Sequence, residues 1–358
     1  KKWIKSYRDL PLLINQWANV VRWEMRTRLF LRTSEFLWQE GHTAHATEEE
    51  ALKETKCMLE VYKEVLEKVL AIPVLTGKKS ESEKFAGAIE TLCIEAMMGD
   101  KKALQAGTSH YLGQNFAKAF DVKFQNEDNK EDFVYATSWG VSTRLVGALI
   151  MVHGDDKGLR LPPMVAPTQV VVIPIVRKDE HELKIMDYLK PILSELKKEK
   201  IRVHIDSRSK ISPGYKFNEW EMKGVPIRLE VGCRDIEKNE LFVARRDTGE
   251  KFSISMGNAS IKIVELLNEI QNELFKQAQE FQIKNTFTAS NWDEFKDLVN
   301  QGGFIKCGWD GNIETEEKIK KETKATIRCI PFDDDPSGQL CIYTGNPARH
   351  QVVFSKAY

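Results

Sequence analysis

The sequence contains Val20-Val21-Arg22-Trp23-Glu24 and, shortly after it, Phe30-Leu31-Arg32-Thr33, which leads into Glu35-Phe36-Leu37-Trp38-Gln39-Glu40-Gly41-His42. These stretches read as two strands joined by a loop, with an arginine on each arm. Strand alternation then places Phe36, Trp38 and Glu40 on one face. The arginine fork suits phosphate oxygens, and an aromatic ring offers a flat surface to a purine. The alternative is a surface ladder of ion pairs, which contributes little energy.

Two further clusters combine small residues with groups that could hold a ligand. In Gln105–His110, glycine and short polar side chains let a ligand approach the backbone closely, although a glycine turn capped by Thr108 would look the same. Ser138–Arg144 reads as a strand that runs into a helix with Arg144 in its first turn. An arginine there opposes the helix dipole unless an anion binds, so this pattern indicates a phosphate site.

The composition is that of a globular protein, with 42% apolar and 30% charged residues. At about 150 residues per domain, the chain of 358 residues predicts two or three domains. The 53 basic and 53 acidic residues cancel, which argues against nonspecific coating of nucleic acid. The longest apolar runs, Leu145–Val152 and Val170–Val176, fall far short of the ~20 residues that cross a bilayer, so no membrane is expected as a partner. Six cysteines without a paired spacing favour a reducing, cytoplasmic compartment.

The first part of the chain is expected to mix strands and helices. Residues 1–45 suggest short strands and turns. Thr47 and Glu50 have the spacing of a capping box, and apolar residues at steps of three or four predict a helix to about Leu70. The other expected elements are a strand over Ala71–Thr76, a loop over Gly77–Ser80, a strand over Phe133–Ser138 and a helix that ends at Gly154.

A proline-rich linker around Pro162, Pro163 and Pro167 indicates a domain boundary near Ala166. Strands and helices alternate after it, which predicts a small α/β domain built on a mixed sheet. The expected strands are Gln169–Val176, Arg202–Asp206, Pro226–Gly232 and Leu241–Arg246, and the expected helices are Glu180–Lys198 and Ile261–Phe281. The predicted domains are therefore 1–166, 167–282 and 283–358, and the last of them has little clear periodicity.

Together these motifs resemble those of prolyl-tRNA synthetases of the eukaryotic and archaeal type, a family of class II aminoacyl-tRNA synthetases. The matching segments are Val20–Glu24 with Phe30–His42 (motif 2), Gly140–Arg144 with Gly147 (motif 3), Gly107–Phe116 (a prolyl-specific signature), and Ser212–Phe217 with Lys223–Gly232 (the anticodon-binding domain). The resemblance implies an α+β fold. It comprises an antiparallel-sheet catalytic domain whose N-terminal part is missing, an α/β anticodon-binding domain and a small α+β, zinc-ribbon-like C-terminal domain.

The resemblance implies ATP-dependent ligation of proline to tRNA(Pro) through a prolyl-adenylate, with Mg²⁺ as a cofactor. Arg22 and Arg144 would be the catalytic residues. The residues implied in ATP binding are Arg22, Glu24, Arg32, Thr33, Phe36, Gln105, Thr108, Ser142 and Arg144. Those implied in proline binding are Arg22, Trp38, Glu40, His42, Phe85, His110, Ser138 and Gly140. The prolyl carboxylate would attack the α-phosphorus in line while positive groups stabilise the developing charge, so no general base is needed.

The second domain is implied to bind the anticodon of tRNA(Pro). Arginine suits the edge of guanine, a carboxylate suits cytosine, and aromatic rings stack on single-stranded bases. The candidate residues are Arg208, Lys216, Phe217, Glu230 and Arg234. A solvated surface charge is the alternative for each charged residue among them. The family also implies a homodimer.

Two elements of the family, motif 1 and a Thr-x-Glu amino-acid loop, would precede Lys2–Ile4. A product of these 358 residues alone is therefore expected to be catalytically impaired. The alternative function is a non-catalytic, synthetase-like protein that binds tRNA or regulates, which the retained phosphate arginines disfavour. A synthetase for threonine, histidine or glycine is a third reading, against which Trp38 and the Thr108–His110 signature argue.

The C-terminal domain of this family often binds zinc through four cysteines. Cys307 and Cys341 match two of those positions, but Asn312 and Tyr343 occupy the other two. A tetrahedral thiolate site needs four ligands, so we expect no structural zinc. The alternative is a substitute ligand, for which the candidates are Asp310 and His350.

The segment between the motif 2-like and motif 3-like stretches is too short for a large editing insertion. Because one methylene group contributes only ~1–3 kcal/mol to discrimination, the enzyme is expected to activate alanine or cysteine measurably. ATP–pyrophosphate exchange with each amino acid tests this expectation, and tight rejection of both would contradict it.

Overall fold

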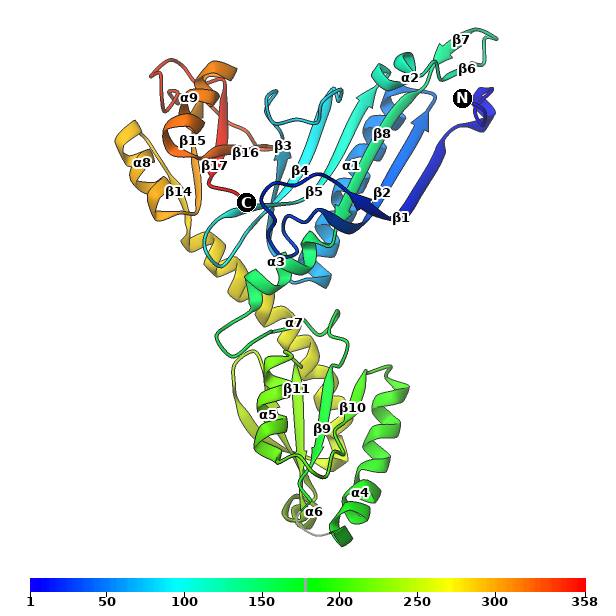
Figure 1. Ribbon diagram of the computed structural model, residues 1–358, viewed down its shortest axis with the longest axis vertical. Helices are drawn as coiled ribbons and strands as arrows, with labels where there is room; N and C mark the ends of the chain where they lie inside the picture. The colour runs from blue at the N-terminus through cyan, green and yellow to red at the C-terminus, as the bar shows by residue number, and fades with distance from the viewer. Residues whose placement is uncertain (177–178) are drawn as a thin grey trace. The chain divides into compact units, whose positions relative to one another are not determined.

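The computed structural model describes residues 1–176 and 179–358, which form two compact units. The first unit contains residues 1–67, 72–152 and 280–358, and the second contains residues 68–71 and 153–279. The C-terminal segment thus belongs to the same unit as the N-terminal part of the chain (Figure 1).

A large sheet organises the first unit, and its neighbouring strands are antiparallel except for the last pair. In order across the sheet, the strands of the described residues are β1 (Leu12–Val21), β2 (Glu35–His45), β8 (Tyr135–Ser142), β5 (Ala103–Gly113), β4 (Glu90–Met97), β3 (Val74–Lys78), β16 (Thr326–Pro331), β17 (His350–Ser355), β15 (Phe304–Trp309) and β14 (Thr286–Thr288). The helices of this unit are α1 (Glu48–Glu64), α2 (Asn115–Ala119), α3 (Arg144–His153), α8 (Trp292–Gln301) and α9 (Ile313–Thr323). The antiparallel catalytic sheet expected from the sequence is confirmed.

The N-terminal hairpin is longer than expected. Strands β1 and β2 pair continuously from Leu12↔Ala44 to Val21↔Glu35, so the expectation of short strands over residues 1–45 is wrong. Strand β2 also pairs with β8, and β8 pairs with β5. Gln105–His110 lies inside β5, which rules out the alternative of a glycine turn.

Helix α1 begins where the sequence predicts and continues as a short π-helix over Val65–Val69. Thr47 caps it, because the Thr47 hydroxyl accepts the N–H of Glu50 at 3.3 Å. The Glu50 carboxylate, however, accepts the N–H of Ala46 at 3.2 Å. The expected capping box is therefore wrong in one of its two bonds, because Glu50 accepts from Ala46, the residue before the N-cap, and not from Thr47 itself.

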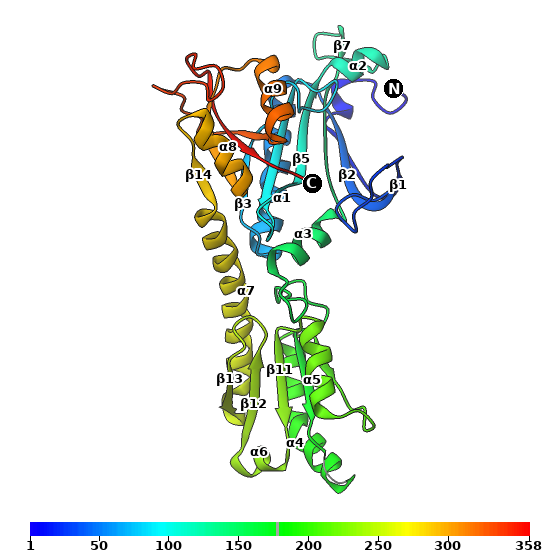
Figure 2. The same cartoon turned by 60° about the vertical axis from the view of Figure 1, so that its left-hand side comes forward.

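Helix α1 covers one face of the large sheet, where it packs on β5, β8 and β4 (Figure 1, Figure 2). Thr55, Leu59 and Tyr62 are buried at helical spacing, as the periodicity predicts. Two hydrogen bonds fix the contact: Tyr62 donates to the Gln39 side chain at 2.7 Å, and Ser109 donates to the Thr55 carbonyl at 2.7 Å. Odd-numbered residues of β2, and of β5 from Gly107 onward, thus face α1, which leaves the even-numbered ones for the opposite face. An irregularity in the pairing of β5 with β4 interrupts the alternation between Gln105 and Gly107.

Strand β3 lies further along the chain than the expected strand at Ala71–Thr76. Ala71 has φ of 56°, in the left-handed region, so the strand cannot begin there. Gly77, expected in a loop, pairs with Cys93 on one side and with Pro331 on the other. A Cβ atom on Gly77 would stand 2.3 Å from the Ile330 carbonyl oxygen, so this approach of two strands requires glycine.

Strand β8 also begins later than the expected strand at Phe133–Ser138. Phe133 belongs to β7 (Glu131–Phe133), which pairs with β6 (Lys123–Gln125) in a separate small hairpin. Strand β8 then continues to Ser142, four residues beyond the expected end. Its longer course is what brings Ser142 into the same sheet as Trp38.

A mixed sheet forms the second unit, as the alternation of strands and helices predicts. Its strand order is β10 (Val203–Ile205), β9 (Val170–Pro174), β11 (Ile227–Val231), β12 (Glu240–Arg245) and β13 (Lys251–Ser255). The first three strands are parallel and the last three are antiparallel. The helices here are α4 (Asp179–Lys198), α5 (Pro213–Met222), α6 (Cys233–Lys238) and most of α7 (Ala259–Lys284), and α4 and α7 pack their apolar faces on the sheet.

The C-terminal segment builds its own hydrophobic core from β15, β16, β17, α8 and α9, and then joins the catalytic sheet through β16. Among the helices in residues 1–176 and 179–358, none has both the length and the apolar character needed to cross a membrane.

A buried ionic cluster ties this C-terminal segment to the catalytic sheet. Glu95 on β4 is fully buried and accepts from Lys79 at 2.7 Å and from Arg328 of β16 at 3.0 Å. Lys79 also donates to the Arg328 carbonyl at 2.7 Å. A buried carboxylate is tolerated only when its charge is matched and its oxygens are hydrogen-bonded, and both conditions hold here.

Replacing Arg328 with Met should lower the free energy of unfolding by about 3–5 kcal/mol, because Glu95 would remain as a buried charge with one partner fewer. Lys78→Met, which removes a half-exposed ion pair with Glu90, should cost about 1 kcal/mol or less. Urea denaturation of the two variants tests the comparison. Equal losses in both would show that the buried contact of Arg328 with Glu95 contributes no more to stability than the half-exposed pair.

Candidate functional site

The sheet face opposite α1 carries the predicted site residues in rows. Because side chains alternate along each strand, residues paired between strands at even positions share this face. One row joins Glu40, Gly140 and Thr108, a second joins His42, Ser138 and His110, and a third joins Trp38 and Ser142. The antiparallel register therefore assembles side chains from three separate segments of sequence.

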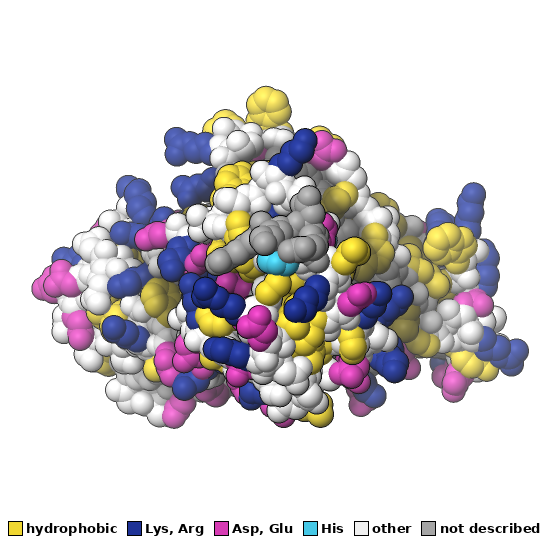
Figure 3. Space-filling view, turned by 90° about the horizontal axis from the view of Figure 1, so that it is seen from below, with side chains coloured by type: hydrophobic (Ala, Val, Ile, Leu, Met, Phe, Trp, Pro, Cys, Tyr) yellow, Lys and Arg dark blue, Asp and Glu magenta, His cyan; other side chains and the backbone are white. Residues whose placement is uncertain are grey.

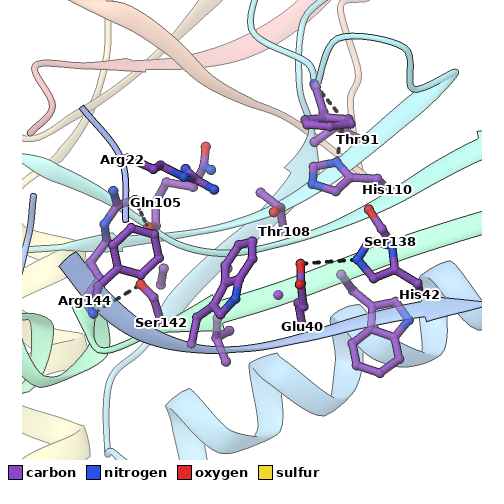
Figure 4. A pocket seen from close by; sticks show the side chains of 18 of the residues that line it. Arg22, Glu40, His42, Thr91, Gln105, Thr108, His110, Ser138, Ser142 and Arg144 are labelled. Carbon is purple, nitrogen blue, oxygen red and sulfur yellow. Dashed lines mark hydrogen bonds and ion pairs between the residues drawn. The ribbon is translucent and has the colours of Figure 1, made fainter. Parts of the chain in front are cut away.

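These rows form the floor of a cavity of about 430 Å³. Figure 4 shows the labelled side chains projecting into it from several strands. The predicted residues that line it are Arg22, Phe36, Trp38, Glu40, His42, Phe85, Gln105, Thr108, His110, Ser138, Gly140, Ser142 and Arg144. Every residue expected to hold proline is thus found at one site.

A second cavity, of about 390 Å³, shares Arg22, Phe36, Ser142 and Arg144 with the first. Its other predicted lining residues are Glu24, Arg32 and Thr33. Three guanidinium groups from different parts of the chain therefore meet beside one hollow. Their mutual repulsion makes the position favourable for an anion with several charges.

Arg144 is held in place by backbone carbonyls. Its Nε donates to the Leu31 carbonyl at 2.9 Å, and another guanidinium nitrogen donates to the Gln105 carbonyl at 3.3 Å. Burial lowers the pKa of Arg144, and the positive charges of Arg32 and Arg22 act in the same direction. This guanidinium is partly desolvated and is fixed before any ligand arrives.

The other two arginines of this cluster have aromatic or acidic partners. Arg22 lies over the rings of Phe36 and Trp38, at 5.3 and 5.4 Å from their centroids. Arg32 binds Glu24 at 2.8 Å, and the hydrogen bond from Arg32 lowers the pKa of that carboxyl group. Glu24 and Arg32, which sequence analysis assigns to adenine and to phosphate, thus contact each other here.

The opposite end of the first cavity is less charged. Burial lowers the pKa of His110 to about 4, so its imidazole is neutral at pH 7. Its Nδ1 lies 2.9 Å from the Thr91 hydroxyl, and its ring lies 4.9 Å from that of Phe85. Glu40, which lines this cavity together with a second acidic residue, Glu83, is bound by the Gln16 amide and by His42 at 3.2 Å.

Two residues at the site, Thr91 and Glu83, were not found from the sequence, and both line the first cavity. Lys356–Tyr358 resembles the end of the family's chain, which the resemblance implies can lie near the active site, and Tyr358 lines the second cavity. Thr91 extends the row of His110 by one strand, so a prediction of β4 and its register would have found it. The Tyr358 ring lies against Arg28 and Lys102, and its hydroxyl donates to Asp100.

The candidates in the second unit have different surroundings. Arg208 binds Asp206 at 2.6 Å and Glu219 at 2.7 Å. Lys216 is buried and donates to the Asp206 carbonyl at 2.9 Å. Phe217 packs under Arg228, which binds Glu230 at 3.0 Å, and Arg234 is exposed on α6. Seen from below, basic and acidic side chains are interspersed on the molecular surface (Figure 3).

Cys307 and Cys341 are buried in the core of the C-terminal segment. Burial raises the pKa of the Cys307 thiol, which disfavours the thiolate that a metal requires. At the two other positions, Asn312 caps α9 and Tyr343 donates to Glu322. Asp310 accepts from Thr315 and Thr344, and His350 binds Asp334 at 2.6 Å. Whether zinc binds stays a prediction.

Three family models match consecutive parts of the chain. Residues 1–153 match the class II tRNA synthetase core domain for G, H, P, S and T, and residues 169–272 match the anticodon-binding domain. Residues 292–358 match the C-terminal domain of prolyl-tRNA synthetase.

Full-length similarity to curated proteins agrees with these matches. The chain is 57% identical to a proline–tRNA ligase of Cytophaga hutchinsonii, with all of this chain and 73% of that protein aligned. It is 56% identical to the proline–tRNA ligase of Bacteroides fragilis, over 73% of that protein, and 58% identical to that of Chlorobium phaeobacteroides, over 76%. The resemblance inferred from the motifs is therefore confirmed, and the chain belongs to the prolyl-tRNA synthetase family of class II synthetases.

Proposed function

We propose that this chain ligates L-proline to tRNA(Pro) in two steps, with ATP consumed in the first. The observation that carries the proposal is the meeting of Arg22, Arg32 and Arg144 at a hollow that continues into a pocket walled by aromatic side chains. Proline–tRNA ligases with 56–58% identity along the whole chain support the same activity. Nothing in these similarities favours the non-catalytic alternative.

The arginine-rich end suits ATP. Arg32 and Arg144 are proposed to hold the β- and γ-phosphates, and Phe36 to stack on adenine, whose amine would be bound by Glu24 in exchange for Arg32. Gln105, Thr108 and Ser142 are proposed to line the ribose and phosphate region, and Thr33 to complete it. A charged group that is held in place before the reaction stabilises developing charge without reorganising. The hydrogen bonds of the Arg144 side chain to two backbone carbonyls hold it in this way.

The neutral end suits proline. Trp38, Phe85 and His110 offer apolar ring faces to a pyrrolidine, and Ser138 and Gly140 form the floor between them. Glu40 supplies the negative charge that a protonated imino nitrogen requires, with His42 bound to it. Arg22, which lines both cavities, is proposed to bind the prolyl carboxylate and the α-phosphate together.

The reaction needs little from the protein beyond placement and charge. The carboxylate oxygen of proline attacks the α-phosphorus in line, and pyrophosphate leaves toward Arg32 and Arg144. The resulting prolyl-adenylate then loses its acyl group to the terminal ribose of tRNA. Between β2 and β8 the chain forms only elements of the catalytic sheet, its helices and a small hairpin, so the proposal includes no separate editing domain.

Mg²⁺ is proposed to arrive with ATP, where it neutralises the polyphosphate. Among the described residues that line the second cavity, Glu24 is the acidic one, and Arg32 occupies its carboxylate. The donor set therefore does not fit a metal site made by the protein itself. Phosphate oxygens and water are the ligands that such a Mg²⁺ prefers.

The second unit is proposed to bind the anticodon of tRNA(Pro). Arg208, Glu230, Arg234 and Phe217 are the proposed contacts, since ion pairs on a surface can exchange partners with base edges at low cost. Lys216 would contribute mainly through Asp206, because it is buried. We further propose three domains, at 1–166, 167–282 and 283–358.

We also propose a homodimer that acts in the cytoplasm. The apolar residues left exposed on the edge strand β1 support an interface there: Trp17 is 84% exposed and Leu13 is 56% exposed. Light scattering of the full-length enzyme at several concentrations measures the oligomeric state.

Replacing Arg22 with Met should lower kcat/KM for proline-dependent ATP–pyrophosphate exchange by about 10²–10³-fold, since one group that stabilises the reacting charge is lost. Arg26→Met is the matched control, because Arg26 is exposed in the same loop and lines neither cavity. Similar activity of the two variants in the full-length enzyme would remove the basis of the assigned site.

Acid should destabilise the first unit through His110. An unfolded histidine has a pKa of about 6.5, and burial lowers that of His110 to about 4. The unfolded chain therefore binds more protons between these values, so this stabilisation is present above pH 6.5 and is lost as the pH falls toward 4.

His110→Gln should consequently be more destabilising, relative to the unchanged protein, at pH 7 than at pH 4. Urea denaturation at a series of pH values measures this difference. A difference that stays constant over the range would mean that His110 is not held neutral by its surroundings.

A further inference from the structure

The connection between β3 and β4, residues 79–89, forms one wall of the proposed proline pocket. Two of its side chains, Glu83 and Phe85, line the cavity. The Phe85 N–H donates to the Thr91 hydroxyl at 3.0 Å, and that hydroxyl also bonds His110 at 2.9 Å. The Thr91 hydroxyl therefore links the backbone of this connection at Phe85 to the ring of His110.

Helix α9 of the C-terminal segment holds the same connection from outside. Ser80 donates to one carboxylate oxygen of Glu316 at 2.9 Å, and Ser82 donates to the other at 2.7 Å. Lys320, one turn further along α9, binds Glu83 at 3.0 Å. Both carboxylate oxygens of Glu316 thus bind the start of the connection, and the second contact, at Ser82, lies three residues before Phe85.

Glu316 is an unusual residue for a surface helix, because it is only 3% exposed. Burial raises the pKa of its carboxyl group, whereas the hydrogen bonds from Ser82 and Ser80 lower it. A buried carboxylate without these hydroxyl donors would be strongly unfavourable. The position of α9 and the conformation of the connection are consequently coupled.

We propose that Glu316 is a positioning residue for proline, through which the C-terminal segment sets the aromatic wall of the amino-acid pocket. It touches neither proline nor ATP; it acts through Ser80 and Ser82 on Phe85 and His110. The ATP end is built on β2, β5, β8 and α3, and none of the hydrogen bonds or ion pairs described above joins its proposed residues to this connection. Loss of Glu316 therefore weakens proline binding and leaves ATP binding largely unchanged. This inference rests on the proposed function.

The test measures KM for proline, KM for ATP and kcat in ATP–pyrophosphate exchange by the full-length enzyme. Glu316→Ala should raise KM for proline about tenfold or more, the range expected for losing hydrogen bonds to a charged group. KM for ATP should stay within about twofold. A purely structural role would instead lower the active fraction and affect kcat without this split between the two substrates.

Two companion variants sharpen the result. Ser80→Ala with Ser82→Ala should reproduce the rise in KM for proline, and adding Glu316→Ala to this pair should cause little further change, because all three residues act through one contact. Glu317→Ala is the matched control, since Glu317 is the exposed neighbour on the same helix. It should leave all three parameters unchanged.

The inference is overturned if KM for proline is unaffected in both Glu316→Ala and the serine pair, or if KM for ATP rises in parallel. The triple variant removes the buried carboxylate together with its two hydroxyl donors and so leaves no unpaired charge, and the comparison therefore holds even where Glu316→Ala or the serine pair folds poorly. If the full-length enzyme without any substitution showed no proline-dependent ATP–pyrophosphate exchange, the proposed function would be overturned as well. An active enzyme with unaffected variants would overturn only this inference.

Discussion

The hydrogen-bonded register of β2, β8 and β5 is the constraint on which the site depends. A strand moved by one residue would turn Trp38, Glu40 and His42 toward α1 and bury them, because the side-chain period is two. The contacts on the other face oppose such a slip: Tyr62 binds Gln39, and Ser109 binds the Thr55 carbonyl. Helix α1, on the sheet face away from the cavities, thus maintains the alignment of the residues that line them.

Charge is distributed unevenly along this face, so its two ends differ in character. The guanidinium groups collect at one end, where burial and the positive charges of Arg32 and Arg22 lower the pKa of Arg144. At the other end lie a neutral His110, aromatic rings and Glu40, and the cavity's second acidic residue, Glu83, is paired with Lys320. Arg22 lies between the two ends, over Phe36 and Trp38. The carboxylate of proline and the α-phosphate of ATP would therefore meet at a single cation, Arg22.

Sequence analysis predicted the floor of the site well, because alternation along β2 and the motifs around Arg22 and Arg144 are local signals. It placed the boundaries of β3 and β8 less well, since Ala71 and Phe133 adopt conformations that depend on neighbours elsewhere in the chain. Thr91 was missed because its place follows from the pairing of β4 with β5. Glu316 could not be found at all: in the sequence it is one glutamate among several on a polar helix, and only the fold brings it to Ser80 and Ser82.

The contact between Ser80 and Glu316 joins residues that are 236 positions apart in the chain. A ribosome adding about 5–20 residues per second needs roughly 10 to 50 s to pass from one to the other. Once Arg144 has been added, the emerging polypeptide contains every arginine of the nucleotide end, but its amino-acid wall still lacks the support from Glu316, which is synthesised later. With the proposed role of Glu316, selective use of proline would be delayed until that residue has been translated, so a shorter product would bind nucleotide before it could choose an amino acid.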